Sequence, residues 1–129
     1  MKKMEKMKVD SSSFENLKRA FDNLQLSIST PIREPRDLSG IIKDFEMVYE
    51  LSWKVMKKVL QSQGVQTTGP KDVFSKAYQL NLIEDENIWL EMIESRNQAA
   101  HVYDKKSAEK IVSRVKNIYI DLFPKYFDL

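Results

Sequence analysis

A short polar segment, residues 96–104, contains the side chains best suited to chemistry. It reads RNQAAHVYD and holds Arg96, Asn97, Tyr103 and the single histidine of the chain, His101. An imidazole titrates near neutral pH and can take or give a proton, whereas a guanidinium stays charged and offers a fork of donors to phosphate oxygens. The segment is therefore the candidate functional site, because it combines a proton-transfer group with an anion-binding group.

Spacing predicts how these side chains lie. Asn97 and His101 are four apart and share a helix face, whereas Arg96 and His101 are five apart, about 140° around an ideal helix. If the residues after His101 form an extended connector, His101 and Tyr103 point to the same side. We expect Arg96, His101 and Tyr103 to converge at a junction between two helices that is open to solvent.

A purely structural interpretation of the same residues stays open. Arg96 could pair with a nearby carboxylate, such as Glu91 or Glu94. His101 could cap a helix end, and Tyr103 could close the rim of the core. In that case the segment only joins two helices.

Composition limits the classes of protein to consider. The chain has 129 residues, enough for one domain, and its 21 Lys and Arg against 19 Asp and Glu give a formal charge of +2, too small to indicate a strongly basic surface. With no cysteine and one histidine, a zinc site is not expected, nor is any other metal or cofactor. No segment resembles a signal peptide or a membrane span, so we expect a soluble, cytoplasmic protein.

Several catalytic motifs are missing from the sequence. There is no Gly-rich phosphate loop and no Gly-x-Ser-x-Gly motif. The Gly-Ser and Asp-x-Asp elements of a polymerase-type nucleotidyltransferase are also missing. The acidic run 84–86 fits the N-terminus of a helix, where negative charge is favourable. If nucleotidyl transfer concerns this protein, another chain performs it.

Apolar spacing predicts helices throughout, and the three glycines and four prolines are few for a protein rich in turns. A first helix should begin at a capping box formed by Ser12 and Glu15 and run to about residue 29, with residues 1–10 as a frayed tail. A long second helix with two apolar seams should end at Gly64. A short third helix, about 70–80, should close at Asn81 in a left-handed conformation.

The last two helices flank the polar segment. The fourth should begin at residue 84 or 85 and end near Asn97, and the fifth should begin at an N-cap, Asp104. Pro124 should kink or end the fifth helix near Phe123. The expected fold is all-α: a single domain over residues 1–129, an antiparallel up-and-down four-helix bundle with an additional short helix.

Some apolar residues exceed what one core needs. On the second and fifth helices Tyr49, Met56, Tyr119 and Phe123 could remain exposed and form an interface with a second copy or a partner.

The polar segment resembles a known motif. Arg96-Asn97-x3-His101-x-Tyr103 matches the Arg-x4–6-His motif of HEPN domains, and over residues 12–122 the chain is similar to the nucleotidyltransferase substrate-binding protein family. The other positions that carry this resemblance are Asp44-Phe45-Glu46, Glu50-Leu51-Ser52-Trp53-Lys54, Gly64, Pro70, Ala77, Leu82-Ile83 and Trp89.

The resemblance implies a homodimeric helical bundle and a partner, a minimal nucleotidyltransferase encoded nearby. In one interpretation the chain is the non-catalytic, substrate-binding subunit of that enzyme, with Arg96, Asn97, His101 and Tyr103 contacting a nucleotide or RNA. In the alternative it is a metal-independent ribonuclease toxin, with Arg96 and His101 catalytic and Asn97 orienting the imidazole. The resemblance then implies that the partner silences it by adenylylating Tyr103. A third interpretation is a helical adaptor in which the motif is structural only.

Overall fold

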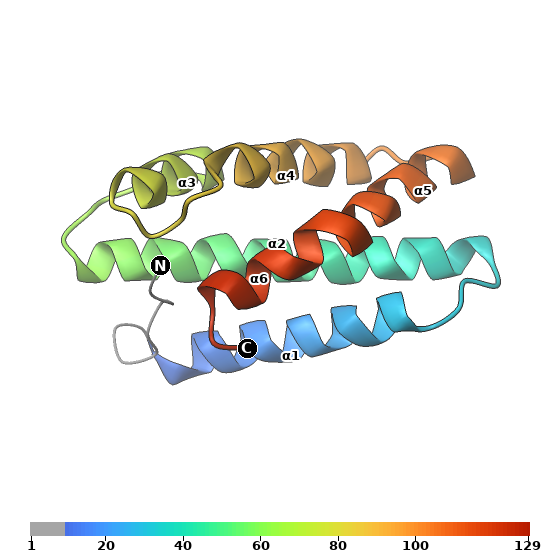
Figure 1. Ribbon diagram of the computed structural model, residues 1–129, viewed down its shortest axis with the longest axis horizontal. Coiled ribbons are helices and arrows are strands. Elements are labelled where there is room, and N and C mark those ends of the chain that lie inside the picture. Colours follow the sequence, from blue (N-terminus) through green and yellow to red (C-terminus); the bar gives the residue numbers. More distant parts are fainter. Residues whose placement is uncertain (1–9) are drawn as a thin grey trace.

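Helices make up all the regular structure of the part of the chain that the computed structural model describes, residues 10–129 (Figure 1). In chain order they are α1 (Ser11–Ser29), α2 (Pro35–Ser62), α3 (Pro70–Gln79), α4 (Glu86–Ala99), α5 (Lys105–Arg114), the π-helical turn η2 (Val115–Tyr119) and α6 (Ile120–Tyr126). The predicted all-α class is confirmed. No helix within the described range is long and apolar enough to cross a membrane. Of the predicted frayed tail, residues 1–9 lie outside the described residues.

The longest helix, α2, runs through the middle of the molecule, and the others pack around it. α1 lies beside α2 and runs the opposite way, α3 and α4 follow each other along another side, and α5, η2 and α6 cross back over (Figure 1). Because α2 contacts α1, α3, α4 and α5, both of its apolar seams are covered. The two seams predicted from its sequence are therefore both buried, apart from Trp53, which is half-buried.

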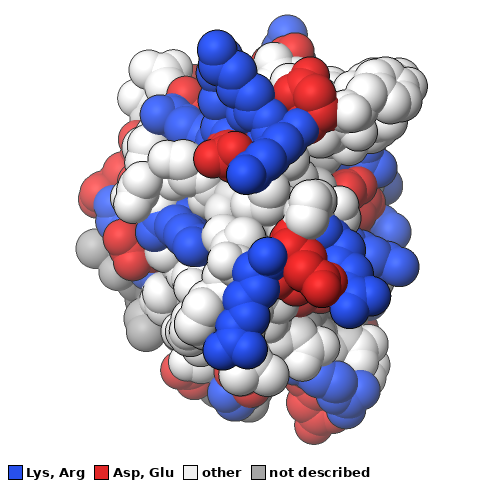
Figure 2. Space-filling view, turned by 90° about the vertical axis from the view of Figure 1, so that its right-hand side faces the viewer, with Lys and Arg blue, Asp and Glu red and all other residues white. Residues whose placement is uncertain are grey.

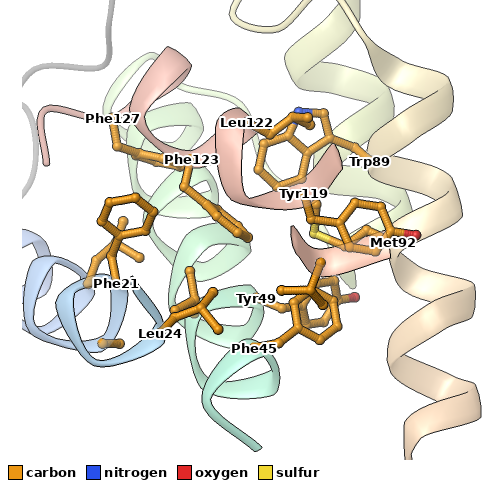
Figure 3. Packing of buried hydrophobic residues seen from close by; sticks show 14 of the residues in the cluster. Phe21, Leu24, Phe45, Tyr49, Trp89, Met92, Tyr119, Leu122, Phe123 and Phe127 are labelled. Carbon is orange, nitrogen blue, oxygen red and sulfur yellow. The ribbon is translucent and has the colours of Figure 1, made fainter. Parts of the chain in front are cut away.

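The predicted surplus of exposed apolar residues is wrong. Tyr49, Met56, Tyr119 and Phe123 are each at most 3% exposed. They are buried because α5, η2 and α6 lie over α2 and bring the aromatic rings of the two segments together. Phe45 and Tyr119, for example, stack with their ring centroids 5.5 Å apart (Figure 3). None of these four residues is available to form an interface.

Aromatic contacts continue through the core toward α4. Trp89 is fully buried, and its ring centroid is 5.1 Å from that of Phe74. Its ring centroid also lies 5.9 Å from that of Phe123 (Figure 3). Aromatic pairs at these separations stabilise a core beyond the area they bury. Trp89 thus joins α3, α4 and α6 and fixes the start of the helix that carries the polar segment.

The first helix begins earlier than its sequence suggested. Asp10, not Ser12, is the N-cap, and its carboxylate accepts hydrogen bonds from the Ser13 backbone N–H (3.0 Å) and the Ser12 hydroxyl (2.6 Å). A carboxylate is at least as good a cap as a hydroxyl, and Lys58 of α2 pairs with it at 3.0 Å. The predicted Ser12–Glu15 capping box is therefore wrong, whereas the predicted end of the helix near residue 29 is confirmed.

The turns after α2 and α3 form as predicted. Gly64 has a φ of 80° and Asn81 a φ of 60°, both in the left-handed region that ends helices. Pro124 behaves differently, because α6 continues through it to Tyr126. The buried aromatic side chains of Phe123, Tyr126 and Phe127 hold this last turn against the core, which offsets the N–H that Pro124 lacks.

Candidate functional site

The polar segment connects α4 to α5. α4 ends at Ala99, the backbone N–H of His101 donates to the carbonyl of Gln98 (2.9 Å), and the chain then runs through a non-helical connector to Asp104. Asp104 caps α5 as predicted, accepting from the Ser107 backbone N–H at 2.7 Å, and this hydrogen bond holds the pKa of its carboxyl below the usual value. The connector is therefore fixed at both ends, where two helices meet.

An open pocket of about 490 Å³ lies at this junction. Asn97 and His101, the pair that the sequence placed on one face, both line it. The remaining lining residues are Glu94, Gln98, Val102, Ser107, Lys110 and Ile111. Carboxylate, amide, imidazole, hydroxyl and ammonium groups thus surround an apolar floor, an arrangement that suits a small polar ligand with an anionic group.

Arg96 lies outside this pocket. Its Nε atom is 3.6 Å from Oε2 of Glu46 and 3.7 Å from Oε1 of Glu50, both on α2. The sequence suggested Glu91 or Glu94 as carboxylate partners, and that expectation is wrong. Successive helix residues point about 100° apart, so Arg96 faces α2 while Asn97 faces α5.

The two alternative carboxylates have other roles. Glu91 pairs with Arg114 of α5, and it also accepts a hydrogen bond from the Tyr119 hydroxyl at 2.9 Å. The hydrogen bond from Arg114, together with that from Tyr119, holds the pKa of Glu91 below its usual value. Glu94 lines the pocket instead.

Tyr103 is 87% exposed and does not line the pocket. It does not close the rim of the core, and its phenol does not meet the guanidinium of Arg96. Within one chain the structure therefore brings Asn97 and His101 together and keeps Arg96 and Tyr103 apart from them. The expected convergence of Arg96, His101 and Tyr103 does not occur within a single chain.

Glu46 and Glu50 form a carboxylate pair on α2 that the sequence indicated only among the positions of the family resemblance and not as part of the site. Glu50 also accepts a hydrogen bond from Nε1 of Trp53 (3.3 Å) and lies 3.9 Å from the Lys54 ammonium. Burial, with the nearby Glu50 carboxylate, raises the pKa of Tyr49 to about 12. Glutamates four apart on a helix are typical of solvent-facing surface, so only the fold reveals that these two face Arg96.

The pocket residues that sequence reasoning missed did leave a signal. Glu94 and Gln98 on α4 stand at helical spacing from the predicted residues Asn97 and His101, and the four form a polar stripe that runs from the last turns of α4 into the connector. Lys110, one turn after Ser107, adds the positive charge from α5. A search for polar residues at helical spacing on both sides of the connector would have found them.

Charges of both signs are mixed around the junction. Figure 2 shows the end of the molecule where α4 passes into α5, with Lys and Arg side chains interspersed with Asp and Glu. The exposed Lys105 and Lys106 follow the connector directly, and Lys110 reaches the pocket. Lysines are therefore available at the junction, although acidic side chains lie among them. Among residues 10–129 no three His, Asp or Glu side chains lie close enough together to hold a metal ion.

Comparisons with known proteins show the family and the fold of the chain. The sequence pattern of the family described as "nucleotidyltransferase substrate binding protein like" matches residues 12–128. Over 89 residues the chain is 34% identical to a Haemophilus influenzae protein named probable ribonuclease HepT, a match that covers 65% of this chain and 61% of that protein. The match therefore spans less than two thirds of the relative's length.

A solved structure shares the architecture. A crystal structure of a protein from Thermus thermophilus superposes with a TM-score of 0.75 at 24% identity, covering 82% of this chain and 91% of that one. At this level of identity the likeness is one of fold.

Proposed function

Because the chain belongs to the nucleotidyltransferase substrate-binding protein-like family, we propose that it is the non-catalytic, substrate-binding partner subunit of a minimal nucleotidyltransferase. The observation that carries this proposal is the pocket between α4 and α5. It offers Asn97 and Gln98 as hydrogen-bonding groups, His101 as a proton carrier and Lys110 as a cation for a phosphate. These are binding groups on an accessible surface.

The wider assembly belongs to the same proposal. The subunit is a cytoplasmic homodimer built on an antiparallel up-and-down four-helix bundle with one additional short helix, and the enzyme is encoded beside it in a two-protein module. The reversal of direction between α1, α2, the α3–α4 pair and α5–α6 supports this bundle (Figure 1).

The partner role is tested by co-expression with the adjacent nucleotidyltransferase. We expect the two proteins to co-purify and to elute as one complex in size-exclusion chromatography. If both proteins are folded and still elute separately at micromolar concentration, the partner role is wrong.

The pocket is tested with AMP as the probe, followed by NMR amide shifts of the isolated chain. We expect shifts at Asn97, His101 and Lys110, and we expect Lys110→Glu to abolish them. Lys71→Glu, the same charge change at an exposed position outside the pocket, should leave them in place. Shifts that survive Lys110→Glu would place the ligand elsewhere.

The alternative is a metal-independent ribonuclease, favoured by the name of the Haemophilus influenzae relative. In this reaction His101 would take the proton of an RNA 2′-hydroxyl, whose oxygen attacks phosphorus to form a 2′,3′-cyclic phosphate, while the 5′-oxygen leaves and takes a proton from water. Arg96 would stabilise the charge on phosphorus. Within one chain the guanidinium pairs with α2 and does not line the pocket of His101. This geometry supports binding better than cleavage.

Cleavage is tested with single-stranded RNA in the presence of EDTA. If the ribonuclease alternative holds, the wild-type chain cuts the RNA, His101→Ala does not, and Lys71→Glu cuts as well as wild type. Equal cleavage by wild type and His101→Ala would attribute the activity to a contaminant.

The same alternative makes Tyr103 the point of control. Its phenol oxygen would attack the α-phosphorus of ATP held by the partner enzyme, forming a phosphodiester to AMP and releasing pyrophosphate and a proton. The added phosphate places negative charge beside the connector, where it opposes an RNA phosphate. The 87% exposure of Tyr103 supports access by another protein.

This modification is tested by intact mass after incubation with the partner and ATP. We expect a gain of one AMP that Tyr103→Phe loses and that Tyr78→Phe, at another exposed tyrosine, retains. A modified Tyr103→Phe protein would move the acceptor to a different residue.

A further inference from the structure

Arg96 is held in an unusual way between α4 and α2. Its Nε atom is buried and makes no hydrogen bond among the described residues, although two carboxylate oxygens lie 3.6 and 3.7 Å away. The side chains of Arg96 and Glu46 are each 30% exposed, and that of Glu50 is 36% exposed. The guanidinium thus has two ion pairs and no hydrogen bond to any group in residues 10–129.

Such contacts hold a guanidinium loosely. An arginine fixed for structural reasons donates directional hydrogen bonds, usually two in parallel to one carboxylate. Ion pairs without hydrogen bonds at a partly exposed site contribute little to stability and are exchanged easily. Arg96 can therefore still bind an anion, while the negative charges of Glu46 and Glu50 repel an anion that approaches it.

Glu50 is held more firmly than the arginine. Its Oε2 accepts from Nε1 of Trp53, and the Lys54 ammonium lies 3.9 Å from it. These contacts keep the carboxylate in place when the guanidinium leaves. Arg96 directly precedes Asn97, which lines the pocket, so its long side chain starts beside the pocket and points away from it.

We propose that Glu46 and Glu50 form a releasable clamp that holds Arg96 on the α2 side of α4, and that a phosphate-bearing ligand in the pocket draws the guanidinium away from the clamp. This inference rests on the proposed function, because it assumes that the pocket takes such a ligand. Glu46 and Glu50 act through Arg96 and do not touch the ligand. They lower the affinity of the site until a phosphate competes for the guanidinium.

Removing the clamp charges should therefore tighten binding. We expect Glu46→Gln and Glu50→Gln each to lower the dissociation constant for AMP about threefold, and the double variant to lower it about tenfold, as for weak, partly exposed ion pairs. Adding Arg96→Ala to the double variant should remove the gain. Glu15→Gln, an equal charge change at an exposed position on α1, should have no effect.

Two further measurements make the test specific. The first is a titration, in EDTA, with a fluorescein-labelled single-stranded RNA of ten nucleotides. It shows whether the phosphate that the site binds belongs to a nucleotide or to a polynucleotide. The rate at which phenylglyoxal modifies Arg96, measured by peptide mass spectrometry against the exposed Arg33, reports on the clamp without any ligand. We expect the double variant to raise this rate several-fold and Glu15→Gln to leave it unchanged.

The outcomes separate this proposal from the proposed function. Tighter binding of AMP or RNA together with faster modification of Arg96 supports the clamp. Weaker or unchanged binding in the double variant overturns the clamp. Weaker binding would mean that the two carboxylates position Arg96 for the ligand. If neither probe binds the wild-type chain, the proposed function fails, and an unchanged modification rate would then overturn the clamp as well. A gain in affinity cannot come from damage to the fold.

Discussion

Three consecutive residues near the end of α4 point into three different surroundings. Ser95 is buried and its hydroxyl lies 2.7 Å from the Tyr119 hydroxyl, Arg96 faces the carboxylates of α2, and Asn97 lines the pocket. A turn of about 100° per residue produces this division. The inward hydroxyl contact, together with the buried Trp89 and Met92, therefore holds α4 in the rotation that gives the two polar residues after Ser95 their directions.

Tyr119→Phe tests this anchoring contact. Phenylalanine keeps the ring that stacks on Phe45, but it leaves the Ser95 hydroxyl buried without its partner and removes the hydrogen bond to Glu91. We expect the free energy of unfolding to fall by about 1 to 3 kcal/mol, measured by urea denaturation. Because the two hydroxyls share one hydrogen bond, Ser95→Ala should lower the free energy of unfolding much less in the Tyr119→Phe variant than in the wild type. Fully additive losses would show that the contact carries no coupling.

At the scale of the elements, the glycines at the two ends of α2 should respond with opposite signs. Gly40 lies inside the helix with open space where a Cβ would stand, whereas Gly64 has a φ of 80° after its end. We expect Gly40→Ala to raise the free energy of unfolding by about 0.5 to 1 kcal/mol, because glycine is a poor helix former. Gly64→Ala should lower it by about 1 to 2 kcal/mol through left-handed strain. Thermal and urea unfolding measure both, and equal signs would contradict this assignment of the helix end.

Local signals in the sequence predicted the elements well, and contacts between elements were harder to predict. The left-handed Asn81 and the cap Asp104 depend on a few neighbouring residues, and both were correct. The partner of Arg96 depends on which face of α2 lies opposite α4, which no local pattern encodes. The burial of Tyr119 was missed for the same reason, because it depends on how the last helical segment lies over α2. Of the site, sequence spacing placed Asn97 beside His101 and turned Arg96 away from them, but it could not show that Arg96 faces α2 and does not meet His101 and Tyr103.

At the scale of the whole molecule, the carboxyl groups predict a stability that falls in acid. Between residues 10 and 129, six carboxyl groups have a pKa below the ordinary value: Asp10, Asp37, Asp72, Asp85, Glu91 and Asp104. A lowered pKa in the folded state adds stability that is present above the unfolded value and is lost as pH falls through the folded value. The urea midpoint should therefore decrease below about pH 4.

Glu91→Gln isolates one of these groups. Its pKa is lowered from 4.5, first by the hydrogen bond from Arg114. The wild type should exceed the variant in stability at pH 7, and this difference should be smaller at pH 3, because below pH 4.5 the Glu91 carboxyl binds a proton more readily in the unfolded chain than in the folded one. Glu15→Gln serves as the exposed control on α1. A difference that is the same at both pH values would mean that the charge of Glu91 adds no stability.

Buried phenols predict a second loss of stability at alkaline pH. Burial is the main cause that raises the pKa of Tyr49, Tyr119 and Tyr126 above the ordinary 10.0, to about 12 for Tyr49. A raised pKa adds stability that is fully present below the unfolded value and is lost as pH rises toward the folded value, because only the unfolded chain ionises readily in that range. Tyr49→Phe keeps the buried ring and removes the ionisation. Between pH 7 and pH 11, the free energy of unfolding of the variant should therefore rise by about 1 kcal/mol relative to that of the wild type. Urea unfolding at the two pH values measures this gain, and its absence would mean that the Tyr49 phenol ionises as easily in the folded chain as in the unfolded one.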